Sequence, residues 1–90
     1  MNIYVNIKPF ERLQEILIED NGETSHHYVF LEDIPATILN DYKHKTPSDS
    51  CTIRLIGNNA FNQECERKIN ECFIKEYGIA DYILIKDKGE

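Results

Sequence analysis

The sequence predicts a small mixed α/β domain of the α+β kind, in which one mixed sheet is packed against helices. Three observations lead to this class: an alternating apolar run at residues 3–7, a two-residue hairpin signal at residues 20–23, and a strand-helix-strand unit over residues 51–85. A chain of 90 residues with no long linker fits one core. We therefore expect a single domain over residues 1–90, with 86–90 as a frayed, charged tail.

The first strand is predicted from alternation at period two. Ile3, Val5 and Ile7 fall on one face of residues 3–7, with polar or amphipathic residues between them. Pro9 is expected to end this strand, because proline has no backbone N–H for the ladder.

Residues 12–20 are open to two interpretations. Leu13 and Leu17 have helical spacing, and Gly22 could end such a helix. Against this, Asn21-Gly22 suits a type I′ turn, and residues 24–31 beyond it are rich in β-formers. We favour a hairpin, which gives the element order β-β-β-α-β-α-β. The helix would give an open sheet with the order β-α-β-α-β-α-β.

A short helix is predicted from about Pro35 to Lys43. Asp33 is a good N-cap, and Pro35 is tolerated in the first helical turn. Residues 46–50, Thr-Pro-Ser-Asp-Ser, then read as a polar loop.

The second half of the chain predicts a strand, a long helix and a strand. Residues 51–56 are strand-like, and Gly57-Asn58-Asn59 provides a turn and an N-cap. Apolar residues then recur at helical spacing up to Gly78, which is expected to end the helix in a left-handed conformation. Residues 82–85 predict a last strand parallel to the strand at 51–56.

This element order resembles the ribonuclease H-like topology shared by many nucleases, transposases and actin-like ATPases. In catalytic members the resemblance implies an acidic residue in the middle of the first strand, where it binds a divalent metal. The strand centre here is Tyr4-Val5-Asn6. Because the neutral Asn6 does not supply the charge of a carboxylate at a two-metal site, the resemblance implies a reduced, non-catalytic relative.

Charge and composition exclude several classes of function. A formal net charge of −6 argues against a direct nucleic-acid binder, because such proteins carry a basic face. No apolar stretch is long enough for a bilayer and no signal peptide is visible, so we expect a cytoplasmic protein that does not bind membranes. The three cysteines, Cys51, Cys65 and Cys72, include no close pair and indicate neither a disulfide framework nor a metal knuckle.

The individual reactive residues predict no catalytic, cofactor-binding or metal site. His26 and His27 are adjacent in a predicted strand and therefore point to opposite faces. Cys65 and Cys72 are seven residues apart on a helix, about 10 Å, which is too far for one metal ion to bridge. Gly57 begins the turn before a helix, but the phosphate-binding glycine patterns are absent.

Two features instead indicate binding to another protein. The sheet edge at residues 24–31 offers unpaired backbone groups to a strand of a partner or of a second copy, which would make a homodimer. The candidate partner-binding side chains are the acids around the hairpin, which suit a basic surface, and one apolar residue opposite the helix's main stripe: Glu15, Glu19, Asp20, Glu23 and Ile74.

The leading hypothesis is a small, acidic, non-enzymatic protein-binding module without a cofactor. Its size and acidity suit a phage or mobile-element accessory protein that inhibits a nucleic-acid-binding enzyme. The alternative is a minimal metal-dependent nuclease or phosphatase of ribonuclease H-like fold that uses Asp20, Asp33 and Asp81.

Overall fold

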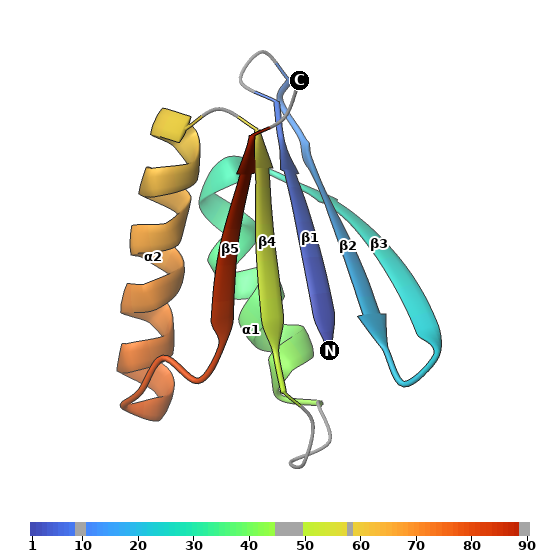
Figure 1. Cartoon of the computed structure of the whole chain (residues 1–90), viewed down its shortest axis with the longest axis vertical. Coiled ribbons are helices and arrows are strands. Elements are labelled where there is room, and N and C mark those ends of the chain that lie inside the picture. The colour runs from blue at the N-terminus through green and yellow to red at the C-terminus, as the bar shows by residue number, and fades with distance from the viewer. Residues whose placement is uncertain (9–10, 45–49, 58, 89–90) are drawn as a thin grey trace.

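The computed structural model describes residues 1–8, 11–44, 50–57 and 59–88, and in them one five-stranded sheet carries two α-helices (Figure 1). The elements in chain order are β1 (Asn2–Ile7), β2 (Gln14–Asp20), β3 (Glu23–Val29), the 3-10 turn η1 (Leu31–Asp33), α1 (Ile34–Tyr42), β4 (Thr52–Gly57), α2 (Asn59–Tyr77) and β5 (Ile83–Lys88). The α/β class is confirmed, as is the order β-β-β-α-β-α-β along the chain. The alternative with a helix before the turn is wrong, because residues 14–20 form a strand.

The sheet is mixed, with the strand order β3-β2-β1-β4-β5. The pairs β1–β2 and β2–β3 are antiparallel, whereas β1–β4 and β4–β5 are parallel. The parallel relation of the last strand to β4 was predicted from the sequence. The first strand of the chain therefore lies at the centre, and the Thr52 N–H donates to the Met1 carbonyl (2.9 Å) where β4 begins beside it.

The backbone angles of the turn between β2 and β3 agree with the predicted hairpin. Asn21 has φ 56° and Gly22 has φ 81°, the two positive values that a type I′ turn requires. The ladder runs without a break from Asp20 opposite Glu23 to Gln14 opposite Val29.

Both helices pack on one face of the sheet, which we call the covered face. Most of its residues on β1, β2 and β4 are apolar and almost fully buried, and they meet buried residues of the two helices. The main members are Ile3, Val5, Ile7, Ile16, Ile18, Ile53 and Leu55 from the sheet, Ile34 and Ile38 from α1, and Cys65, Ile69 and Phe73 from α2.

An aromatic cluster closes one end of the core. The Phe73 ring on α2 lies 4.9 Å from that of Tyr42 on α1 and 4.7 Å from that of Tyr82, measured between centroids. Tyr77 joins them, 5.1 Å from Tyr42. These edge-on and tilted contacts fix the two helices against each other.

The described helix ends match the sequence-based expectation at Gly78 and differ from it at Asp33. Asp33 occupies the N-cap position of α1, but its side chain makes no capping bond; the Thr37 hydroxyl instead donates to the Asp33 carbonyl (2.9 Å). At the end of α2, Gly78 has φ 78° and donates its N–H to the Ile74 carbonyl (2.9 Å), as predicted for a left-handed terminator.

The prediction of a frayed tail at 86–90 is wrong for residues 86–88. The last strand continues through Lys88, because Lys86 and Lys88 stand in register with Leu55 and Gly57 of β4. Residues 89–90 lie outside the described residues, as do Pro9, most of the 46–50 loop and Asn58. Among the described residues no helix is long and apolar enough to cross a membrane.

Candidate functional site

The sheet face opposite the two helices, which we call the open face, is covered by no described element. Its residues alternate with those of the core, and the strand registers place them in three rows of five. From β3 to β5 the middle row is His26, Leu17, Tyr4, Arg54 and Ile85, one flanking row is Tyr28, Glu15, Asn6, Ile56 and Asp87, and the other is Thr24, Glu19, Asn2, Thr52 and Ile83.

The middle row makes the centre of the open face apolar. Leu17, Tyr4 and Ile85 are half-buried there, although no helix packs on them. Arg54 lies between Tyr4 and Ile85, and its Nη1 is 3.8 Å from the Asp87 carboxylate. Most of the flanking residues are polar. An apolar centre holding Tyr and Arg inside a polar rim is the composition typical of protein-binding sites.

Tyr28 stands out on this face because 62% of it is exposed and yet its ring is held in place. Its hydroxyl donates to Glu15 Oε2 (3.2 Å), and Asn6 Nδ2 donates to the other oxygen of the same carboxylate (3.0 Å). The hydrogen bond to Glu15, followed by the charge of that carboxylate, raises the pKa of Tyr28 above its ordinary value. Glu15 therefore joins three strands and positions an aromatic ring.

A further exposed apolar area lies at the end of the β2–β3 hairpin that is away from its turn. Leu13 precedes β2 and Phe30 follows β3, one step beyond the last pair of the ladder, and they are 46% and 43% exposed. The Arg12 guanidinium carbon lies 5.9 Å from the centre of the Phe30 ring, a cation-π contact.

A polar hollow of about 400 Å³ lies on the other side of the hairpin, between its tip and the end of α1. Three carboxylates line it, those of Asp20, Glu23 and Asp41. Next to it His27 Nε2 on β3 approaches Asp41 Oδ2 on α1 to 3.2 Å, an ion pair when the imidazole is protonated. This contact connects the hairpin to α1.

The predicted acidic cluster is divided between the two faces. Glu15 and Glu19 lie on the open face, whereas Asp20 and Glu23 lie at the polar hollow on the covered side. The division follows from the pleat, since Glu19 and Asp20 are consecutive and point to opposite faces.

Ile74, the fifth predicted partner-binding residue, lies on neither face. It is 47% exposed on α2, apart from the hairpin acids.

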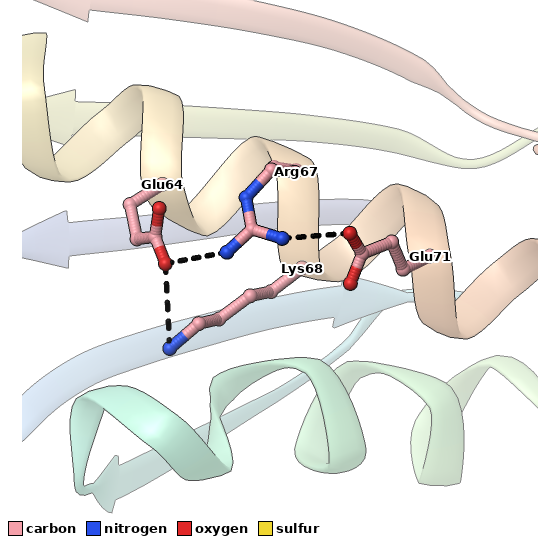
Figure 2. Close-up of polar contacts among 4 residues, drawn as sticks. All are labelled: Glu64, Arg67, Lys68 and Glu71. Carbon is pink, nitrogen blue, oxygen red and sulfur yellow. Dashed lines mark hydrogen bonds and ion pairs between the residues drawn. The ribbon is translucent and has the colours of Figure 1, made fainter.

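The exposed side of α2 also carries a compensated set of charges (Figure 2). Arg67 binds Glu64 and Glu71 (both 2.7 Å), and Lys68 lies 3.7 Å from the same Glu64 carboxylate. The hydrogen bond from Arg67 is the main cause that lowers the pKa of Glu64. Two acids and two bases satisfy one another there, so this surface offers less to a charged partner than the hairpin does.

The histidines and cysteines occupy the positions that the sequence suggested. His26 lies on the open face and His27 on the covered side. Cys51 and Cys65 are buried, and burial raises the pKa of the Cys65 thiol to about 12, so it carries negligible thiolate near neutral pH. Within the described residues, no group of three His, Cys, Asp or Glu side chains suits a metal ion.

The three acids of the enzymatic hypothesis are not brought together. Asp20 ends β2, and Asp33 precedes α1, whose nine residues span about 13 Å. Asp81 accepts a hydrogen bond from the Tyr42 hydroxyl at the far end of α1 (2.8 Å). It precedes β5, which is three strand spacings from β2, or about 14 Å.

Two buried polar residues were missed at the sequence level. Gln14 is 4% exposed; it accepts from the Lys8 N–H (2.6 Å) and donates to the carbonyls of Lys8 and Glu11, which closes the β1–β2 connection. Asn62 is fully buried on α2. Its spacing of three residues before Cys65 continues the apolar stripe, a signal that could have found it.

No family model, curated protein or solved structure matches this chain. The ribonuclease H-like topology is therefore not confirmed.

Proposed function

We propose that this chain is a small non-enzymatic protein that works by binding another protein through the open face of its sheet. The observation that carries the proposal is an uncovered face five strands wide, whose central row joins Leu17, Tyr4, Arg54 and Ile85. Sheets in small domains usually bury an apolar face against another element. Here the second face is partly apolar and has no such element among the described residues.

The charge of the chain favours a partner with a basic surface. The open face carries the carboxylates of Glu15, Glu19 and Asp87 against the single guanidinium of Arg54, and the chain as a whole has a formal net charge of −6. Opposite charge speeds encounter and selects among partners more than it adds affinity. Glu19 is the exposed acid of this set that no described contact occupies, so we expect it to be the first to meet the partner.

The finer form of the proposal concerns the partner's activity. A small acidic surface can compete with nucleic acid for a basic groove, which suits a phage or mobile-element accessory protein that inhibits a nucleic-acid-binding enzyme in the cytoplasm. Size and charge support this form, and it predicts inhibition that weakens as salt rises.

The test compares the open face with the helix surface. Leu17→Arg places a long charged side chain in the centre of the open face, and Ile74→Arg makes the same change on α2. The tagged wild type and both variants are used to capture proteins from the native host, and the captured protein is then purified and titrated against all three by calorimetry. We expect Leu17→Arg to abolish binding and Ile74→Arg to leave it unchanged.

The opposite pattern would move the site to α2, and equal binding by all three chains would overturn the proposal. Circular dichroism of each variant establishes that the fold is retained.

A second set of variants separates charge from shape. Glu19→Gln on the open face is compared with the pair Asp20→Asn and Glu23→Gln at the polar hollow, and Glu15 is left intact because it holds Tyr28. If only Glu19→Gln loses the salt dependence of partner binding, the result supports the open face as the binding surface. Loss only in the hollow variant contradicts it.

A further inference from the structure

The outer edge of β3 differs from the other edge of the sheet. In Figure 1 β3 forms one side of the sheet, and both helices lie toward β1, β4 and β5. Its residues are mostly exposed, and its ladder with β2 contains no bulge. The edge strand β5 carries Lys86 and Asp87, the kind of charges that keep an edge from pairing. The β3 segment, Glu-Thr-Ser-His-His-Tyr-Val, has neither lysine nor proline.

The hairpin geometry identifies which backbone groups of β3 face outward. Asp20 and Glu23 flank the two-residue turn and form a hydrogen-bonded pair, and antiparallel pairs alternate from there. Glu23, Ser25, His27 and Val29 therefore turn their N–H and C=O groups toward β2. Thr24, His26 and Tyr28 turn theirs to the free edge, and none of the backbone bonds described outside the ladders uses them.

We propose that β3 pairs with β3 of a second copy of this chain in antiparallel orientation, with His26 opposite His26 on the two-fold axis. This register makes Thr24 oppose Tyr28 of the second copy, so all three outward residues form hydrogen-bonded pairs. If the axis moved to Ser25, Tyr28 would lie opposite the turn residue Gly22. If it moved to His27, Thr24 would lie opposite Phe30, whose carbonyl already accepts the Asp33 N–H (2.9 Å). The free edge is thus fully used in one symmetric register only.

Side-chain pairing agrees with this register. Tyr28 lies opposite a β-branched threonine twice, a favourable cross-strand combination. Glu23, the only carboxylate of β3, lies opposite Val29, so no two carboxylates meet. Since directly opposed residues share a face, both open faces lie on the same side of a ten-stranded sheet. One strand pair is a small interface, so we expect a weak dimer.

Sedimentation velocity of the purified full chain over a wide range of concentrations tests the dimer without any partner, and so independently of the proposed function. We expect a concentration-dependent shift from monomer to dimer. His26→Pro removes two intermolecular N–H donors while leaving the β2 ladder intact, and should weaken the dimer about thirtyfold. His26→Ala, the matched control, keeps the backbone donor and should still dimerise.

A wild type that stays monomeric at every concentration would overturn the proposal. Equal losses in the proline and alanine variants would do so too, because they would assign the contact to a side chain.

Cysteine crosslinking tests the register and does not require the proline variant to fold. Opposed residues of a hydrogen-bonded pair have Cα atoms about 5.5 Å apart, within the reach of a disulfide. His26→Cys should therefore crosslink into a dimer under mild oxidation. Thr24→Cys should not, since the two copies of residue 24 would be about 13 Å apart. Crosslinking by Thr24→Cys alone contradicts the register.

Discussion

The two faces of this sheet are built from alternate residues of the same strands, but their compositions differ. The centre of the covered face consists mainly of fully buried aliphatic residues, such as Ile3, Ile16 and Ile53. The open face mixes Tyr4, Leu17 and Ile85 with Arg54 and several acids. One face is therefore composed for stability, and the other is free to be composed for recognition.

The largest expected effect compares the same residue type on the two faces. Ile53→Ala on the covered face should cost about 2–5 kcal/mol of unfolding free energy, because it leaves a cavity in the fully buried core. Ile85→Ala on the half-buried open face should cost about 1 kcal/mol. Urea denaturation of both variants measures the difference, and equal costs would show that the open face is as much a part of the core.

Asn62 of α2 is one of two buried polar residues that the structure describes on the covered side, and its replacement sharpens the comparison. Its Nδ2 lies 3.4 Å from the Leu55 carbonyl and 3.5 Å from that of Gly57, both long, while its Oδ1 has no partner in the part of the chain that the structure describes. Asn62→Leu should therefore stabilise the protein by about 1 kcal/mol in urea denaturation. Asn40→Leu on the exposed side of α1 is the control. Destabilisation at Asn62 would mean that the amide has a structural role.

The pKa values of Tyr28 and Tyr42 are both raised, but for different reasons. Burial is the main cause that raises the pKa of Tyr42 to about 12, with Asp81 second, whereas the hydrogen bond to Glu15 is the main cause for Tyr28. Glu15→Gln should therefore return the pKa of Tyr28 toward its ordinary value, while Asp81→Asn should lower that of Tyr42 only in part. Ring NMR signals followed against pH report each residue, and a complete return of Tyr42 would contradict the role of burial.

The Tyr42 shift also sets an alkaline limit on stability. The folded state holds this proton more tightly than the unfolded state, so the contribution is complete below the unfolded value, about 10, and is lost as pH rises through about 12. Tyr42→Phe should flatten this part of the stability profile.

The smallest expected effect lies outside both faces. Arg67→Ala removes two exposed ion pairs of α2, which contribute little to stability because solvent screens them. Thermal unfolding at low and high salt should show a slight loss that salt screens. A larger loss, independent of salt, would mean that the Arg67 stem packs on the helix.

The sequence predicted most of the fold because period-two and helical patterns report which residues are buried. Asn21-Gly22 resolved the one ambiguous segment, since only a type I′ turn needs two positive φ values there. The site was harder to predict. The acids around the hairpin form one cluster in the sequence but lie on two faces in the structure, and the role of Glu15 depends on Asn6 and Tyr28, which only the strand register brings beside it. Partner-binding residues have no periodicity of their own, so no pattern could locate them.

The central position of β1 has a consequence for synthesis. Of the five strands of this sheet β1 is synthesised first, and it can pair with β2, which in turn pairs with β3, once residue 29 has emerged. Its other edge pairs with β4, which ends at Gly57. Synthesis from residue 30 to residue 57 takes a few seconds at roughly 5–20 residues per second. Throughout that interval the β1 edge lacks its strand partner and Ile3, Val5 and Ile7 lack the β4 part of their core, so the nascent chain should need chaperone protection most before β4 emerges.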